Sequence, residues 1–203
     1  MIGLALTAAV LAPGLASAAP PASAVRQEVM SDAVFWAIVD RSAARADDPD
    51  AQLEALRTEL EALDAESVAG FIRAFEGQMD RAYSWELWGA GYVAYGGMSD
   101  DGFVYFRRWL ISRGRADFER LLASPDDLPL LVPTDAEGLE FEEFAYVAVD
   151  LWSEKTGDQD PPFGLAADGL GTEPRGRPFQ EDPAALAQRY PKTWARFGER
   201  PLG

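Results

Sequence analysis

One stretch of the sequence, residues 85–114, limits what the chain can fold into more than any other segment. Residues 85–95 are apolar on nearly every side, and a helix tolerates this only when other elements surround it. Residues 96–101, GGMSDD, interrupt that pattern, and a second apolar helical pattern follows them. We therefore predict a central helical hairpin that carries the core. Its aromatic side chains are Trp85, Trp88, Tyr92, Tyr95, Phe103, Tyr105, Phe106 and Trp109.

The segments around this hairpin repeat apolar residues every three or four positions, a period typical of amphipathic helices. We predict an all-α fold, a compact multi-helix domain built around the aromatic-rich hairpin. Gly114 stands where the second arm of the hairpin is expected to end in a left-handed cap. Residues that suit helix N-caps are Ser31, Asp48, Asp64, Ser99 and Asp182. The expected helices span residues 31–45, 49–63, 65–79, 85–95, 99–113, 118–122, 140–156 and 182–197.

Three regions of the chain differ in composition. Residues 1–29 are expected to lie outside the fold, and residues 30–157 are expected to form the helical core domain. Residues 158–203 are expected to form a Gly/Pro-rich loop and a C-terminal helical tail that docks on the core. The loop is placed at residues 158–181, where Gly and Pro are frequent and the helical period is lost.

The N-terminal segment allows two interpretations. Residues 2–24 are small and apolar, residues 4–15 fit the hydrophobic region of a signal peptide, and residues 16–18 fit its cleavage site. A signal peptide also has a positively charged start, whereas no charge precedes Arg26. We therefore favour a start codon placed too early, with Met30 as the true start, which predicts a cytoplasmic protein. A genuine signal peptide predicts a secreted one.

The charge balance and two missing residue types exclude several function classes. The chain has 34 acidic and 18 basic residues and a net charge of −16, so we expect no nucleic-acid partner and no membrane partner. It contains no His and no Cys, which excludes catalysis by His or Cys, zinc sites of Cys and His, and thiol redox chemistry. A catalyst would have to use carboxylates, Lys, Arg, Tyr or hydroxyl groups. No cofactor is expected.

Several short motifs carry a resemblance to a known family. They are Phe35-Trp36, Leu87-Trp88, Gly96-Gly97, Ser99-Asp100-Asp101, residues 103–111 (FVYFRRWLI), Gly114 and Pro125-Asp126. Together with residues 174–197, they make the chain from Met30 to Phe197 similar to the bacterial family known as domain of unknown function 4240, while residues 157–173 depart from it. The resemblance implies a helical fold and no established activity, so it assigns no catalytic residue.

Asp100 and Asp101 are the first candidate site residues. Two adjacent carboxylates suit Mg²⁺ or Ca²⁺, with help from Glu86 or Asp150, because hard cations prefer oxygen ligands. The alternative interpretation is acidic charge in the first turn of a helix beside the Ser99 cap, where the helix dipole favours it. We give the second interpretation more weight and assign no metal site.

Arg107 is the next candidate, and Arg108 follows it directly. Adjacent helical positions diverge by about 100°, so we expect one of the two arginines to point inward and the other to be solvated. The inward one is expected to pair with a carboxylate such as Asp101 or Glu86. An arginine that binds an anion or a peptide is the alternative.

Trp88 completes the candidate binding residues, which are Glu86, Trp88, Asp100, Asp101 and Arg107. It shares a helix face with Trp85, where core packing competes with a ligand groove.

Three functional hypotheses remain open on the sequence. We favour a soluble, non-catalytic module that binds a protein or a small molecule in a regulatory or interaction role. The alternative is a carboxylate-based or divalent-metal-dependent enzyme that uses Asp100, Asp101 and Glu86. The third is an acidic decoy of a nucleic-acid-binding protein, which requires negative charge gathered on one face.

Overall fold

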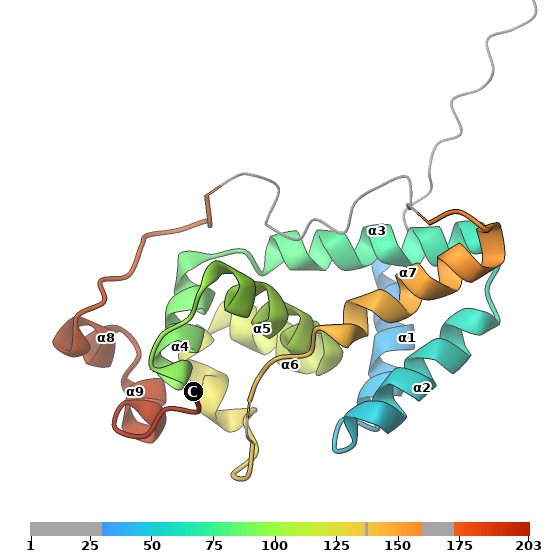
Figure 1. Cartoon of the computed structure of the whole chain (residues 1–203). Coiled ribbons are helices and arrows are strands. Elements are labelled where there is room, and N and C mark those ends of the chain that lie inside the picture. Colours follow the sequence, from blue (N-terminus) through green and yellow to red (C-terminus); the bar gives the residue numbers. More distant parts are fainter. Residues whose placement is uncertain (1–29, 137, 160–172) are drawn as a thin grey trace, which may run out of the picture.

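The computed structural model describes residues 30–136, 138–159 and 173–203, and the regular elements of this part of the chain are all helices (Figure 1). The predicted all-α fold is therefore confirmed. The helices are α1 (Asp32–Ala43), α2 (Pro49–Glu61), α3 (Ala65–Arg81), α4 (Trp85–Tyr95), α5 (Asp100–Ser112), α6 (Arg115–Ala123), the 3-10 helix η1 (Pro125–Leu130), α7 (Glu143–Thr156), α8 (Pro183–Arg189) and α9 (Pro191–Phe197).

Helix α5, the second arm of the hairpin, lies at the centre of the packing. It contacts α1, α3, α4, α6 and α7. On one side of it α3 packs against α7, and α2 packs against both α1 and α7; on the other side α4 and η1 pack against α9 (Figure 1). The aromatic side chains of the hairpin reach both groups of helices, so the hairpin joins them into one core.

The N-terminal ends of the helices follow local sequence signals. Asp48, Asp64, Ser99 and Asp182 each accept a hydrogen bond from the backbone N–H three residues further on, at 2.8–3.1 Å. These bonds satisfy backbone donors that have no partner within the helix. Ser31 also stands at the N-cap of α1, but its side chain makes no such bond, and only its backbone carbonyl accepts from the first turn.

Some predicted boundaries are wrong by a few residues. Helix α7 begins at Glu143 rather than Glu140, because Phe141 is buried in an irregular segment whose N–H points to the carbonyl of Tyr105. Gly114 has the expected positive φ, 93°, but it is the N-cap of α6; the C-cap of α5 is Arg113, in right-handed helical conformation.

The C-terminal segment, residues 173–203, docks on α4 and η1. Arg175 pairs with residues 83–85 through two backbone hydrogen bonds, and α9 packs along α4. Gly89 permits a close approach: a Cβ there would lie 2.2 Å from the hydroxyl oxygen of Tyr190, whose ring is buried. This close approach is made by a side chain rather than by a second helix backbone.

Two regions singled out in the sequence lie outside the described residues. They are residues 1–29, which hold the signal-peptide-like segment, and residues 160–172, which make up most of the Gly/Pro-rich connection. Among the helices that the structure does describe, none has the length and apolar character needed to cross a membrane.

Candidate functional site

A pocket of about 140 Å³ opens beside the N-terminal half of α5. We call it the aromatic pocket. It contains every candidate binding residue from the sequence except Glu86. Its lining residues are Tyr83, Trp88, Asp100, Asp101, Phe103, Val104 and Arg107.

Two capped helix starts and one tryptophan position the pocket. The hydroxyl of Ser84 caps α4 by accepting from the N–H of Leu87, at 3.2 Å, and Ser99 caps α5 in the same way. The indole N–H of Trp88 donates to the carbonyl of Met98 at 3.2 Å, which ties α4 to the turn before α5. The two sides of the pocket are therefore held together by backbone-directed bonds.

Stacked rings form the pocket walls. The ring of Trp88 lies 4.8 Å from that of Phe103 at an interplanar angle of 12°, and Trp85 stacks on Trp88 at 5.2 Å and 6°. The ring of Tyr83 lies 6.1 Å from Phe103. Such stacks are stabilised by their own ring contacts, so the walls are formed before any ligand enters.

Arg107 is the buried charge of the pocket, with only 1% of its surface exposed. Its Nη1 donates to the carbonyl of Met79 at 2.9 Å and its Nε to the carbonyl of Phe103 at 3.3 Å. The guanidinium carbon lies 4.8 Å from the ring centre of Tyr83 and 4.9 Å from that of Phe103. Burial lowers the pKa of Arg107 to about 10, so the side chain remains cationic at neutral pH.

The expectation that one arginine pairs with Asp101 or Glu86 while the other is solvated is wrong. Both are buried, with Arg108 only 4% exposed, and neither forms an ion pair with a carboxylate of the described residues. Arg108 instead donates to the backbone carbonyl of Glu142 at 3.0 Å and lies over two tyrosine rings. Carbonyl groups and ring faces can hold both arginines because α5 is enclosed by other helices.

Asp100 and Asp101 lie exposed at the mouth of the aromatic pocket. Neither makes an ion pair with a described residue. In the described ranges, no three acidic side chains are grouped in a way that could hold a metal ion. The predicted convergence of Glu86 with these two aspartates is wrong, because Glu86 takes part in a different cluster.

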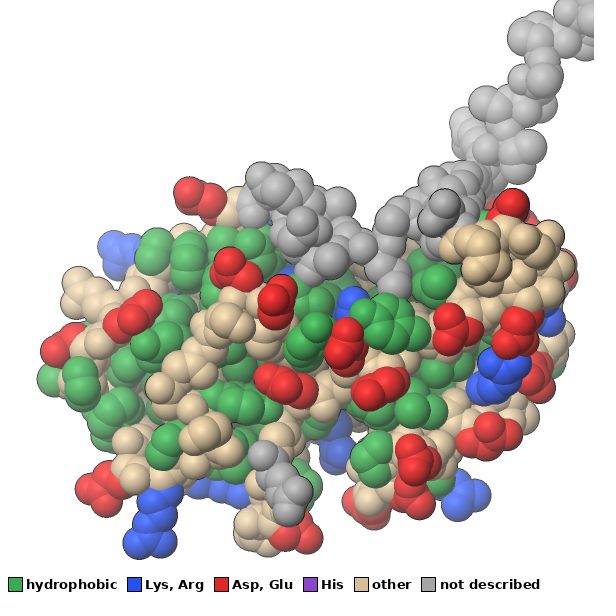
Figure 2. All heavy atoms as spheres, viewed as in Figure 1, with side chains coloured by type: hydrophobic (Ala, Val, Ile, Leu, Met, Phe, Trp, Pro, Cys, Tyr) green, Lys and Arg blue, Asp and Glu red, His purple; other side chains and the backbone are tan. Residues whose placement is uncertain are grey.

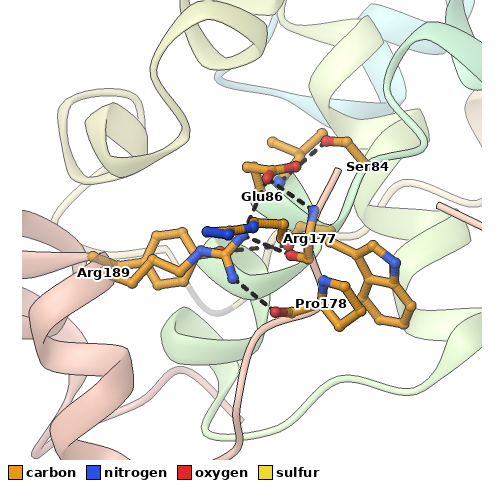
Figure 3. Close-up of polar contacts among 8 residues, drawn as sticks. Ser84, Glu86, Arg177, Pro178 and Arg189 are labelled. Carbon is orange, nitrogen blue, oxygen red and sulfur yellow. Dashed lines mark hydrogen bonds and ion pairs between the residues drawn. The ribbon is translucent and has the colours of Figure 1, made fainter. Parts of the chain in front are cut away.

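Glu86 holds the C-terminal segment on α4 (Figure 3). Its Oε1 accepts from Nη2 of Arg189 at 3.1 Å and from the backbone N–H of Arg177 at 3.3 Å. Arg189 also donates to the carbonyls of Arg177, at 2.7 Å, and Pro178, at 3.0 Å. Gly176, at φ 90°, leaves room for the carboxylate, since a Cβ there would lie 2.0 Å from Oε2 of Glu86. These contacts indicate a structural role for Glu86.

A larger groove of about 820 Å³ lies between the start of α2 and the segment before α7. Trp109 and Arg113 line it, and its acidic side chains are solvent-exposed. These acidic residues are Asp47, Asp50, Asp135, Glu140 and Glu143. The aromatic pocket is the better candidate site because it combines a buried cation, stacked rings and two exposed carboxylates.

Acidic side chains are spread over the face that Figure 2 shows rather than gathered in one patch on it. In Figure 2 they lie across the whole face, separated by hydrophobic and basic side chains. This face therefore does not carry the concentrated negative patch that the acidic-decoy hypothesis requires.

Sequence reasoning missed two contributors to these clusters. Tyr83 lies between α3 and α4, outside any helical period that would mark it as a pocket wall. Arg189 is 103 residues from Glu86 in the chain, and no local pattern links the two positions.

Comparison with protein families gives one match. A family model described as "Protein of unknown function (DUF4240)" matches residues 30–154, which confirms the resemblance seen in the motifs. The match includes α1 to α5 and all the residues of the aromatic pocket; it does not extend to residues 174–197. Comparison with curated proteins and with solved structures found no match.

Proposed function

The chain belongs to the DUF4240 family of proteins of unknown function, and we propose that it is a non-catalytic ligand-binding module whose aromatic pocket receives an anionic group. The observation that carries the proposal is Arg107, a buried cation that lines the pocket and forms no ion pair with a described carboxylate. Burial lowers the pKa of Arg107 and the charge of Asp80 raises it, but Asp80 does not lie within ion-pair distance of this arginine.

The hydrogen bonds of Arg107 leave part of its donor capacity open. A guanidinium has five N–H donors, and the Met79 and Phe103 carbonyls engage only Nη1 and Nε. No described residue accepts a hydrogen bond from Nη2. Burying a cation costs several kcal/mol unless an opposite charge or good acceptors compensate. A carboxylate or phosphate group of a ligand would supply the missing charge and use the open donors.

The chemistry of the pocket favours binding over catalysis. The sequence has no His or Cys to move protons or act as a nucleophile near neutral pH. Arg107 remains protonated there, so it serves as an electrostatic partner rather than as an acid or a base. The volume of about 140 Å³ limits the ligand to a small molecule or a single side chain of a partner.

A fragment screen by ligand-observed NMR tests this proposal. The panel contains carboxylates, phosphates, amines and neutral compounds of equal size, and the hits are expected to be mainly anions. Arg107→Met, which keeps an apolar side chain of similar length, should abolish binding of these hits, and circular dichroism checks that the variant is folded.

Val104→Met serves as a second variant if Arg107→Met does not fold. Val104 lines the aromatic pocket without bonding to Arg107, so the longer side chain should narrow the pocket and weaken every hit. Hits that are mainly amines, or that bind Arg107→Met and Val104→Met as well as they bind the wild type, would contradict the proposal.

A further inference from the structure

We infer that the ligand of the aromatic pocket is a small zwitterion, an ω-amino acid whose carboxylate binds Arg107 and whose ammonium group lies at Asp100 and Asp101. The inference rests on the proposed function, which supplies the anionic group, and adds a second charge and a connecting chain.

The two ends of the pocket carry opposite charges, and neither end forms an ion pair with a described residue. Arg107 lies buried at the inner end, and Asp100 and Asp101 lie exposed at the mouth. A simple anion would have to pass two carboxylates to reach Arg107, and a simple cation would meet Arg107 inside. A ligand with both charges is attracted at both ends.

The lining between these ends suits a methylene chain. Tyr83, Trp88, Phe103 and Val104 present apolar surface there, and no further charged side chain lines the pocket among the described residues. The order is therefore cation, apolar wall and carboxylates, which complements a carboxylate, an aliphatic spacer and an ammonium group.

Helix geometry and volume limit the length of the ligand. The hydrogen bond from Nε of Arg107 to the carbonyl of Phe103 places the guanidinium one helical turn closer to the N-terminus of α5 than the backbone of Arg107. Asp100 precedes Phe103 by three residues, a rise of about 4.5 Å along the helix axis. The pocket volume of about 140 Å³ is close to a cavity known to hold benzene, so it has room for about seven non-hydrogen atoms. An ω-amino acid of four carbons has this size and spacing.

Three probes with the same four-carbon chain test the inference: 4-aminobutyrate, butyrate and butylammonium. They are titrated into the full chain by isothermal titration calorimetry, with the fluorescence of the tryptophans as a second signal. We expect 4-aminobutyrate to bind at least about tenfold more tightly than either singly charged probe.

Substitution of the two aspartates assigns the ammonium site. Asp100→Asn with Asp101→Asn should weaken 4-aminobutyrate to about the affinity of butyrate and leave butyrate unweakened. Both side chains are exposed and make no hydrogen bond to another described residue through their carboxylates, so this variant should fold. The control is Asp47→Asn with Asp50→Asn, which makes the same change of net charge beside the larger groove and should leave all three affinities unchanged.

The outcomes separate the inference from the proposed function. If butyrate binds as tightly as 4-aminobutyrate and is lost in Arg107→Met, the zwitterion inference is wrong and the anion site stands. If none of the three probes binds but other anions bind in the fragment screen, the zwitterion inference is also wrong and the anion site stands. If butylammonium binds most tightly, or if neither the probes nor the anions of the screen bind, both are overturned.

Discussion

Substitution of Gly89 by Ala tests how the C-terminal segment docks on α4. The added Cβ would lie 2.2, 2.6 and 2.8 Å from Oη, Cζ and Cε2 of Tyr190. Tyr190 is 3% exposed, and its hydroxyl lies 3.4 Å from the carbonyl of Trp85, so its ring has no open space beside it. The helix or the ring must move.

Two opposing effects set the size of the change. Alanine is favoured over glycine within a helix by about 1 kcal/mol. Overpacking of a filled core costs about 1–3 kcal/mol, and the contact here is at the severe end of that range because the hydroxyl oxygen and two ring atoms of Tyr190 are involved. We therefore expect Gly89→Ala to destabilise the protein by about 2 kcal/mol.

Gly77→Ala is the matched control. Gly77 also lies inside a helix, α3, but a Cβ there would meet nothing within 4 Å. Only the helix preference remains, so this variant should be more stable than the wild type by up to about 1 kcal/mol. Both free energies of unfolding are measured by urea titration with far-ultraviolet circular dichroism.

A double-mutant cycle identifies the ring as the cause. In a Tyr190→Ala background the obstacle is absent, and Gly89→Ala should become neutral or stabilising, as it is at Gly77. The reasoning is refuted if Gly89→Ala is as stable as Gly77→Ala, or if the same loss appears with and without the Tyr190 ring.

Three further predictions concern single side chains. Trp109→Ala should cost about 3–5 kcal/mol in urea unfolding, the usual scale for a buried large aromatic residue, because Trp109 is 8% exposed and stacks on Phe106; a loss below about 1 kcal/mol would place its ring at a surface. Ser99→Ala should cost about 1 kcal/mol through loss of the bond from the Gly102 N–H, and Ser99→Asp should retain most of the stability; equal stability of the alanine variant and the wild type would show that this cap contributes nothing. Burial raises the pKa of Tyr190 to about 12 from 10.0. The free energy by which the neutral hydroxyl stabilises the fold is therefore fully present below pH 10 and is lost as the pH rises through 12. In the wild type the free energy of unfolding should fall by about 2–3 kcal/mol between pH 10 and pH 12, and Tyr190→Phe should remove this fall. The same fall in the variant would mean that Tyr190 is not the group responsible.

The parts of the fold that local chemistry determines could be predicted from the sequence. Asp48, Asp64, Ser99 and Asp182 mark helix starts because each bonds to a backbone N–H only three residues away. The apolar periods likewise depend on spacing within one helix, which is why the all-α class could be predicted without knowledge of the tertiary contacts.

The environments of Arg107 and Glu86 depend on residues far away in the chain. Arg107 reaches a carbonyl 28 residues before it, and Glu86 bonds to Arg189, 103 residues after it. The sequence pointed to Asp100, Asp101, Trp88 and Arg107 because they lie close together in two adjoining helices, and the structure brings them to one pocket. The sequence alone contains no information on which carbonyl or ring each arginine contacts.

The docking of residues 173–203 on α4 shows that the folded unit extends beyond the last residue of the family match. The family match stops at residue 154, yet α4 lies within it and has buried residues on all its sides, including Leu87, Gly89 and Val93. The segment beyond the match supplies Tyr190 against Gly89 and a hydrogen bond from the Leu202 N–H to the carbonyl of Ala94, at 2.9 Å. A fragment cut to residues 30–154 would thus leave an apolar helix face in water and should self-associate. Any relative without such a segment needs another cover for α4, or polar residues along that face.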